Sequence, residues 1–244
     1  MKRVLITGAS SGIGLQLAKD YLAQGWAVVA CGRSQQKLES ALPVSSQALA
    51  ICVFDIHDAD AIERALSLAT DIDLAILNAG TCEYIDDAQA FDGEKFARVI
   101  HTNVLGTGYC LQAILPKLRA GAQVALVSST ATLLPLTRTQ AYGASKAALD
   151  YLAHALAIDL KPLGIDVSLV RPGFVDTPLT AQNTFSMPGI ISSEQASQRI
   201  MKGLQKRQLE INFPRRLYWV MKCLSLLPGR VWQRIAVKMV REQS

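Results

Sequence analysis

The stretch Val4-Leu5-Ile6-Thr7-Gly8-Ala9-Ser10-Ser11-Gly12-Ile13-Gly14 decides the fold of this chain of 244 residues. Its first three residues form a short apolar run, which is typical of a buried strand. The glycines permit a tight turn, and residues 13–23 have the apolar spacing of a helix. A strand, a glycine-rich turn and a helix in this order predict a pyrophosphate site at the helix N-terminus. The spacing is not the general G-x-G-x-x-G fingerprint, so an ordinary βα turn is the alternative.

Strand and helix patterns alternate along the chain after this unit. Apolar runs predict strands at residues 26–31, 49–54, 74–77, 124–127 and 165–170, and apolar spacing predicts helices at 59–69, 93–100, 104–118 and 142–160. Five or six buried strands separated by helices imply an α/β fold, a Rossmann-like doubly wound parallel sheet with helices on both faces. A chain of this length suits one large domain.

The composition indicates a globular protein and excludes several other classes. Half of the residues are apolar and 18% are charged, with no low-complexity tract or long block of like charge, so no nucleic-acid partner is expected. The five cysteines are an odd number without Cys-x-x-Cys spacing, which argues against a disulfide framework and a zinc site. Met1-Lys2-Arg3 leads directly into the first apolar run, so we expect no secretory signal and a cytoplasmic location.

Residues 129–146 contain candidates for proton transfer. Tyr142 and Lys146 are four residues apart in an expected helix, which places both side chains on one face. A nearby cation lowers the pKa of a phenol by favouring the phenolate, so the pair is a candidate general acid and base. Ser129 follows an apolar run and should lie at the carboxyl end of a strand, where ligands bind in such sheets. Taken alone, Tyr142 and Lys146 can also be surface neighbours on a helix.

Three strand ends carry residues suited to a dinucleotide. The second strand ends in Cys31-Gly32-Arg33, where a guanidinium replaces the usual acidic residue and favours the 2′-phosphate of NADP; an ordinary exposed loop arginine is the alternative. Asp55 follows the third strand and can accept a hydrogen bond from an adenine amino group. Asn78-Ala79-Gly80 follows the fourth strand, and its small residues let a cofactor pass close to the backbone. Both features are also compatible with simple turn chemistry.

These residues, with Asn103 between two helical stretches and Pro172-Gly173 after the last strand, form one ordered set. It reads Thr7-Gly8-x-x-x-Gly12-x-Gly14, Asp55, Asn78-Ala79-Gly80, Asn103, Ser129, Tyr142-x-x-x-Lys146 and Pro172-Gly173. With this set the chain resembles the short-chain dehydrogenase/reductase family over about residues 3–180. Two positions depart from the family pattern: Leu77 stands where an asparagine is common, and Thr132 stands where a glycine is common.

The resemblance implies a role for each catalytic residue. Tyr142 would donate a proton to a substrate carbonyl oxygen, and Ser129 would hydrogen-bond that oxygen. Lys146 would lower the pKa of the tyrosine and hold the ribose hydroxyls of the nicotinamide half, and Asn103 would hold a water that links Lys146 to solvent. The residues expected to bind NADP(H) are Thr7, Gly8, Ser10, Ser11, Gly12, Ile13, Gly14, Arg33, Asp55, Ile56, Asn78, Ala79, Gly80, Tyr142, Lys146, Pro172, Gly173, Val175 and Thr177.

The expected activity is NADPH-dependent reduction of a carbonyl group, or oxidation of the matching alcohol, on a small-molecule and lipophilic substrate. A non-enzymatic NADP-binding regulator on the same fold is one alternative. A membrane-surface protein whose basic tail is the main functional element is another. The family resemblance also implies a homodimer or homotetramer built on the helices that carry Asn103 and Tyr142.

The last part of the chain departs from the family. Residues 1–214 are expected to form the catalytic domain, with a substrate lid at about 178–205, and residues 215–244 a basic helical extension. From Lys202 onward the chain has ten Lys or Arg and two Glu. Near the end, one helix side would carry Val231, Trp232, Ile235, Ala236, Met239 and Val240, and the other Arg230, Arg234, Lys238 and Arg241.

Three partners are compatible with this tail. Its apolar side can pack on the sheet or on a second subunit. It can dock an acidic carrier protein that bears an acyl substrate. It can also lie peripherally on the inner membrane surface, with Trp219 and Trp232 near the interface, because neither segment is long enough to span a bilayer.

Overall fold

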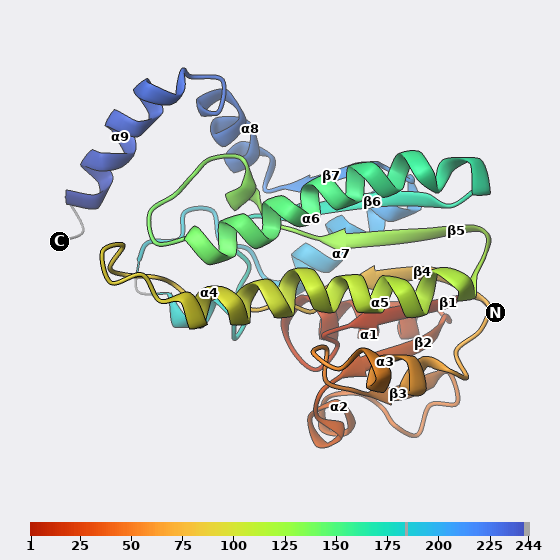
Figure 1. Ribbon diagram of the computed structural model, residues 1–244. Helices are drawn as coiled ribbons and strands as arrows, with labels where there is room; N and C mark the ends of the chain where they lie inside the picture. Colours follow the sequence, from red (N-terminus) through yellow and green to blue (C-terminus); the bar gives the residue numbers. More distant parts are fainter. Residues whose placement is uncertain (184, 242–244) are drawn as a thin grey trace.

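One parallel β-sheet forms the centre of the computed structural model, which describes residues 1–183 and 185–241. The sheet has seven strands in the order β3-β2-β1-β4-β5-β6-β7 (Figure 1). The strands are β1 (Arg3–Thr7), β2 (Ala27–Gly32), β3 (Leu49–Val53), β4 (Ile72–Leu77), β5 (Leu118–Val127), β6 (Asp166–Pro172) and β7 (Glu210–Phe213). Every pairing is parallel.

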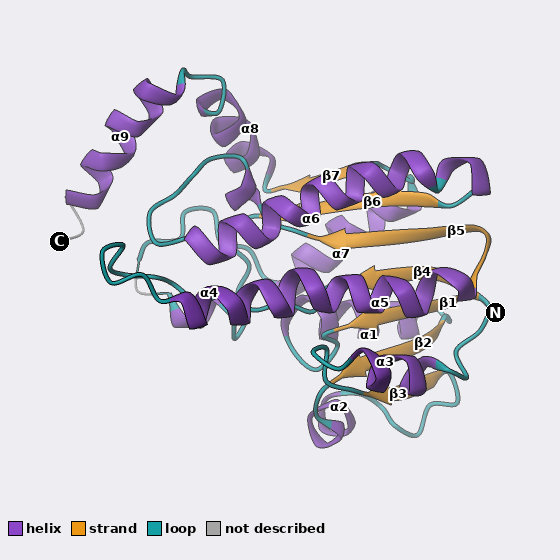
Figure 2. Ribbon diagram, viewed as in Figure 1, coloured by secondary structure: helices purple, strands orange, loops and turns teal. Residues whose placement is uncertain are grey.

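Helices cover both faces of the sheet (Figure 2). One layer contains α1 (Gly12–Ala23), α2 (Gln35–Ala41) and α7 (Ser193–Gln205), and the other contains α3 (Ala59–Leu66), α4 (Gly93–Ile100), α5 (Gly106–Ile114) and α6 (Gln140–Asp159). Successive residues of β1 alternate between the two cores, with Leu5 in one and Val4 and Ile6 in the other. The expected Rossmann-like doubly wound fold is therefore confirmed.

The strand order reverses at β1, because its neighbours are β2 and β4. Ligands bind in open α/β sheets at such a point, outside the carboxyl ends of the strands. Here the Thr7 Oγ1 accepts hydrogen bonds from the backbone nitrogens of Asn78 and Ala79, both at 3.0 Å. The Asn78 side chain donates back to the Thr7 carbonyl oxygen at 3.1 Å. The turns after β1 and β4 are thus held together as one rigid floor.

Three elements were not expected from the sequence, namely α2, β7 and α7. Strand β7 is only four residues long and points two apolar side chains inward, Ile211 and Phe213, which is too short a pattern to identify. Helix α7 occupies part of the expected lid and buries Ala196, Ile200 and Leu204 in the core. Residues 193–205 of the expected lid therefore form a helix packed on the core, and residue 184 of the remaining stretch lies outside the described part.

The segment around Asn103 also differs from the expectation. Helices α4 and α5 are joined by a π-helical turn, His101–Leu105, and a 3₁₀ turn follows at Leu115–Lys117. Strand β5 begins directly afterwards at Leu118, which pairs with Ile72 across a register irregularity. The helix predicted for residues 104–118 is consequently shorter and the strand is longer. A π-helical turn inserts one residue into a helix and is often found at functional sites.

The tail forms two helices, α8 (Arg215–Leu224) and α9 (Gly229–Arg241), at the carboxyl-end edge of the sheet (Figure 1). The side chains of Met239, Val240 and Arg241, and residues 242–244, lie outside the described part. Within residues 1–183 and 185–241, no helix is long and apolar enough to cross a membrane.

Candidate active site

Strand β5 places Ser128 and Ser129 at its carboxyl end. The Ser128 backbone nitrogen donates to the Val170 carbonyl at 2.7 Å and so continues the β5–β6 pairing. The Ser129 Oγ accepts from the Ala131 nitrogen at 3.1 Å, which starts a tight 3₁₀ turn. Thr132 replaces the glycine common in the resembled family, and its hydroxyl donates to the Ser129 carbonyl at 2.9 Å. The departure at Thr132 therefore adds a bond that holds Ser129 in place.

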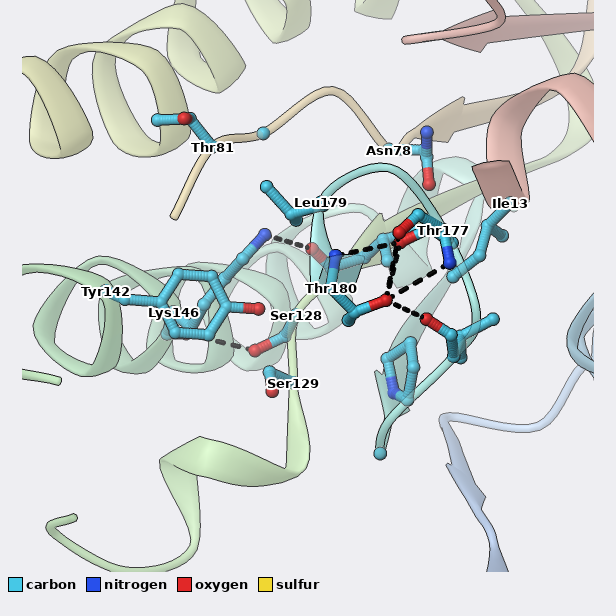
Figure 3. A pocket seen from close by; sticks show the side chains of 15 residues that line it. Ile13, Asn78, Thr81, Ser128, Ser129, Tyr142, Lys146, Thr177, Leu179 and Thr180 are labelled. Carbon is cyan, nitrogen blue, oxygen red and sulfur yellow. Dashed lines mark hydrogen bonds between the residues drawn. The ribbon is translucent and has the colours of Figure 1, made fainter. Parts of the chain in front are cut away.

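The first turns of α6 bring Tyr142 and Lys146 to the same place (Figure 3). The Lys146 Nζ donates to the Val127 carbonyl oxygen at 2.9 Å and lies 5.8 Å from the centre of the Tyr142 ring. With Ser129 they line a small cavity of about 100 Å³ that also includes the predicted residues Ile13, Asn78, Gly80, Pro172, Gly173, Val175 and Thr177. The spacing argument for this pair is consistent with the structure.

Burial controls the proton affinities at this site. Burial raises the pKa of Tyr142, and a hydrogen bond with Ser129 opposes that shift only in part. Burial also lowers the pKa of Lys146 to about 8. Removing a charge from water disfavours it, so both groups move toward their neutral forms. The pKa of Tyr142 is thus raised overall in this structure, because burial is the largest effect on it.

Asn103 lies beneath the cavity and does not line it. Its side chain is fully buried, and it donates to the Thr81 carbonyl and the Ser145 hydroxyl, both at 2.9 Å. Its Oδ1 accepts from the Thr81 nitrogen at 2.8 Å. The π-helical turn thus aims the Asn103 amide at the loop after β4 and ties that loop to α6. The structure brings Asn103 to the site as a support of its floor.

A larger cleft of about 520 Å³ continues from the cavity over the carboxyl ends of β1, β2, β3 and β4. Most of the predicted cofactor residues line it, namely Thr7, Gly8, Ser10, Ser11, Gly12, Ile13, Arg33, Asp55, Ile56, Asn78, Ala79, Gly80 and Thr177. Gly14 does not. A Cβ at that position would lie 2.3 Å from the Gly8 carbonyl oxygen, so Gly14 serves the close packing of α1 against the turn.

The turn before α1 is built to receive an anion. Gly8 and Gly12 have φ angles of 68° and 52°, which glycine adopts without strain. Ser11 is the N-cap residue of α1, yet its side chain makes no capping hydrogen bond. The first amide groups of the helix are therefore available for a phosphate at the positive end of the helix dipole.

Arg33 and Asp55 follow the paired ends of β2 and β3, and both line the cleft. Arg33 is exposed immediately after β2, where its guanidinium can reach a bound anion. Asp55 follows β3, and its Oδ1 accepts from the His57 nitrogen at 3.0 Å and lies 3.2 Å from the His57 Nδ1. Part of the Asp55 role is thus turn chemistry, as the alternative interpretation held.

Several lining residues were missed by sequence reasoning. Thr81, Ser128, Leu179 and Thr180 line the small cavity, and His57, Glu83, Arg98 and Thr102 line the cleft. Most of them lie in irregular loops, which have no recognisable sequence pattern. Arg98 lies on a helix, and the apolar spacing of that helix does not show which side faces the site. Thr81 and Ser128 could have been found, because each adjoins a motif at the end of a strand.

An ionic network supports the site from behind. The Ser128 hydroxyl donates to Asp150 Oδ1 at 2.5 Å, and Arg171 Nε donates to Asp150 Oδ2 at 2.7 Å. An Arg171 terminal nitrogen also lies 2.9 Å from Glu210 Oε2. The Arg171 side chain is only 8% exposed. The described residues contain no cluster of three or more His, Cys, Asp or Glu that could hold a metal ion.

Comparison with known proteins gives consistent matches. A model of the family described as short chain dehydrogenase matches residues 2–187. An uncharacterized oxidoreductase of Myxococcus xanthus is 34% identical, over 96% of this chain and 96% of its own. A serine 3-dehydrogenase of Agrobacterium fabrum is 30% identical, over 89% of this chain and 86% of its own. The crystal structure of a short chain dehydrogenase from Burkholderia cenocepacia in complex with NADP is 25% identical with a TM-score of 0.85, covering 96% of this chain and 98% of that one.

Proposed function

The chain belongs to the short-chain dehydrogenase/reductase family of oxidoreductases, and we propose that it reduces a carbonyl group of a lipophilic substrate with NADPH. The observation that carries the proposal is the continuity of the two hollows. Ser129, Tyr142 and Lys146 meet in a small cavity that shares Ile13, Asn78, Gly80 and Thr177 with the long glycine-lined cleft. A proton donor thus lies at the end of a site shaped for a dinucleotide.

The cleft fits a nicotinamide dinucleotide. The uncapped start of α1 suits the pyrophosphate, Arg33 suits a 2′-phosphate, and Asp55 suits the adenine. Pro172, Gly173, Val175 and Thr177 would hold the carboxamide end, and Lys146 would hold ribose hydroxyls. When bound, NADPH supplies the hydride for the reaction.

Proton transfer is assigned to Tyr142. Because burial raises its pKa, the hydroxyl is protonated across the neutral range and can donate to a substrate oxygen. The Ser129 hydroxyl would hydrogen-bond the same oxygen and stabilise charge that develops on it. Asn103 acts as a positioning residue through Thr81 and Ser145. A binding protein without catalysis has no need of this donor, which argues against the regulator alternative.

The substrate side of the cavity favours an uncharged, apolar molecule. Beyond the residues assigned to the cofactor, its apolar lining includes Val127 and Leu179. Among the described residues that line it, Lys146 is the one charged side chain. A substrate such as serine carries a carboxylate that would need a cationic partner, so the name of the Agrobacterium relative does not transfer readily. Residues 178–192 would cover the substrate, with residues 1–214 as the catalytic domain and 215–244 as its extension.

Association into a homodimer or homotetramer is part of the proposal. Tyr151 and Ile158 on α6 are 81% and 74% exposed, and Leu105 beside α5 is 46% exposed. Large exposed apolar side chains on neighbouring helices are typical of a subunit contact. Sedimentation equilibrium of the purified chain tests this assignment.

A substrate screen tests the activity directly. Purified protein with NADPH would be offered aliphatic ketones, acyl thioesters and quinones, and with NADP⁺ it would be offered serine and long-chain alcohols. We expect oxidation of NADPH with at least one apolar carbonyl compound and none in the Tyr142→Phe variant. Turnover of serine alone would contradict the apolar assignment, and binding of NADPH without any turnover would favour the regulator.

A further inference from the structure

Helix α8 turns an unusual face toward solvent. Its inner side packs on the active-site edge, where a Cβ at Gly173 would lie 2.8 Å from the Leu217 side chain. On its outer side Trp219 and Val220 are 56% and 58% exposed, and Leu226 in the turn after it is 78% exposed. Three exposed cations flank these apolar groups, namely Arg215, Arg216 and Lys222. Exposed large apolar side chains grouped in this way mark an interaction site.

Helix α9 follows α8 and is anchored to the body through Trp232. The Trp232 side chain is 9% exposed, and its Nε1 donates to the Pro135 carbonyl at 3.0 Å. The expectation that Trp232 lies at an interface with lipid is therefore wrong, because the body buries it. Outward-facing residues of α9 are again mixed, with Val231, Ile235 and Val237 exposed beside Arg230, Arg234 and Lys238.

We call the exposed residues of α8, α9 and their turn the tail surface: Arg215, Arg216, Trp219, Val220, Lys222, Leu226, Arg230, Val231, Arg234, Ile235, Val237 and Lys238. The sequence of residues 215–241 contains seven Lys or Arg and no Asp or Glu. Residues 1–214 contain eighteen Lys or Arg and nineteen Asp or Glu, and Glu242 accounts for the remaining acid. The net positive charge of the protein therefore comes from residues 215–241, which carry the tail surface.

Charge selects the kind of partner. Two tail surfaces of this composition repel each other, since neither offers an acid to pair with the cations of the other. An anionic surface is attracted, and anionic lipid headgroups contribute to binding with each Lys or Arg that approaches them. The apolar groups between the cations suit a surface that also accepts indole and aliphatic side chains, as the boundary between headgroups and acyl chains does.

We propose that the tail surface docks the protein on a membrane that contains anionic lipids. The two helices lie along the bilayer, with Trp219, Val220 and Leu226 at the depth of the headgroups and the arginines on phosphates. Leu217 contacts the segment at Gly173 and Trp232 contacts Pro135, so docking brings the mouth of the active site to the lipid. This last step rests on the proposed function and supplies a route for a lipophilic substrate.

Co-sedimentation of the full chain with vesicles tests docking. Vesicles of phosphatidylcholine alone are compared with vesicles of equal parts phosphatidylcholine and phosphatidylglycerol. We expect binding only to the second kind, weakened by salt. Arg215→Glu with Arg216→Glu should reduce it by about tenfold or more. The double variant Trp219→Ser with Leu226→Ser should also reduce vesicle binding by about tenfold or more, even at low salt where the attraction of the cations is strongest. The control is Lys37→Glu with Arg64→Glu, which changes the charge equally on α2 and α3 and should bind like the wild type.

Three outcomes would overturn docking. One is equal recovery of the wild type in the supernatant with both kinds of vesicle. Another is loss of binding in the control variant to the same extent, which would indicate unspecific attraction. The last is conversion of an oligomer to monomers by Trp219→Ser with Leu226→Ser in size-exclusion chromatography, which would assign the surface to a second copy. In the first case, binding of the wild type to polyaspartate would assign the tail surface to an acidic protein instead.

Two readouts keep this inference separate from the proposed function. Circular dichroism and thermal unfolding establish that each variant is folded, as expected for substitutions at exposed positions. Reduction of a water-miscible ketone in the absence of vesicles measures catalysis alone. Variants that lose vesicle binding and keep this activity support docking. If the wild type reduces no carbonyl compound, the proposed function fails, and the vesicle experiment still tests docking independently.

Discussion

Lys146 carries a free-energy cost for the fold. Its side chain is 4% exposed, and the partner of its Nζ is a neutral carbonyl oxygen. The attraction of Asp150 favours the charged form but is outweighed by burial, which lowers the lysine pKa to about 8. A shift from about 10.5 corresponds to about 3 kcal/mol against the charged form in the folded state. A residue that destabilises its own site and is still present fits a functional role.

Replacing this lysine should therefore stabilise the protein while removing its activity. Lys146→Met relieves about 3 kcal/mol of charge burial and leaves the Val127 carbonyl without a donor, which costs about 1 to 2 kcal/mol. We expect the variant to be about 1 to 2 kcal/mol more stable than the wild type at pH 7 in urea unfolding.

The stability advantage of Lys146→Met over the wild type should decrease as the pH rises. Below about pH 8 lysine is protonated in both the folded and the unfolded wild type, so its penalty is fully present. Between about pH 8 and pH 10.5 the folded state has lost the proton and the unfolded state keeps it, so the wild type gains stability as the pH rises. The advantage of the methionine variant should thus disappear by about pH 10. An equal difference in unfolding free energy between the two proteins at pH 7 and at about pH 10 would contradict the argument.

Tyr142→Phe separates proton transfer from binding. The substitution keeps the ring and removes the hydroxyl that is assigned as proton donor. Turnover should fall by about 10² or more, while NADPH binding measured by fluorescence changes little. Retained turnover on a substrate that the wild type reduces would exclude the assigned role.

Arg33→Ala tests the choice of cofactor. Loss of a charge-assisted bond to the 2′-phosphate should raise the KM for NADPH by about tenfold or more and leave the KM for NADH nearly unchanged. Arg64→Ala, which removes an exposed charge on α3, is the control. Equal use of NADH and NADPH by the wild type would show that Arg33 does not select the phosphate.

The candidate residues of the site could be selected because few residue types suit the expected chemistry. The structure places Gly8 and Arg33 in the lining of the cleft and Tyr142 and Lys146 in the lining of the cavity. The pKa of Tyr142 could not be predicted, because it depends on how deeply the folded chain buries the ring. The depth of Asn103 was missed for the same reason.

At the scale of elements, the buried network of Asp150, Arg171 and Glu210 joins α6 to β6 and β7. Its bonds measure 2.7 Å and 2.9 Å, and Asp150 also accepts from Ser128 at 2.5 Å. Helix α6 carries Tyr142 and Lys146, and Ser128 adjoins Ser129. The network therefore holds the two elements that carry the proposed catalytic groups at a fixed separation.

Breaking this network should cost stability and turnover together. Asp150→Ala leaves the Arg171 guanidinium partly unpaired and buried, so we expect a loss of about 3 kcal/mol in urea unfolding. Because Ser129 and Lys146 lose support, kcat should fall more than the KM for NADPH rises. Asp86→Ala breaks the exposed pair with Arg138 and should change stability by about 0.5 kcal/mol or less. Equal effects of the two variants would contradict a special role for the buried network.

Long elements were predicted more reliably than short ones. The apolar run of β2 and the helix α6 are long enough for their spacing to be recognised, and the short run of β1 is identified by the glycine-rich turn that follows it. Strand β7 has two inward side chains, and α7 has a narrow stripe of Ala196, Ile200 and Leu204 in a polar segment, so neither gives a clear pattern. Their place is decided by a neighbour distant in sequence: β6 pairs with β7, and the Asp20 carboxylate of α1 accepts a hydrogen bond from Ser197 of α7 at 2.6 Å.

At the scale of the whole molecule, the site follows from topology. The carboxyl ends of β1 and β4 meet at the switch point, and β5 and β6 continue the same edge. Every motif at a strand end therefore converges there, which is why an ordered set of short motifs predicted one site. The tail is attached to this edge by few contacts, and no pattern within it could indicate which of its two tryptophans is buried.

This attachment makes a last prediction, on the stability of α9 relative to the body. Trp232 is the one side chain of α9 with less than a tenth of its surface exposed among the residues described, and it anchors the helix to Pro135. Trp232→Ala removes that burial, and an isolated helix of 13 residues is marginal in water. Cleavage by trypsin at Arg230 and Arg234 should therefore accelerate by about tenfold or more, while the thermal unfolding of the sheet changes little. Trp219→Ala, which alters an exposed tryptophan of α8, is the matched control and should leave the cleavage rate unchanged. If trypsin cleaves both variants at the rate of the wild type, α9 is held by contacts other than Trp232. A large drop in the unfolding temperature of the Trp232→Ala variant would show that tail and body unfold as one unit.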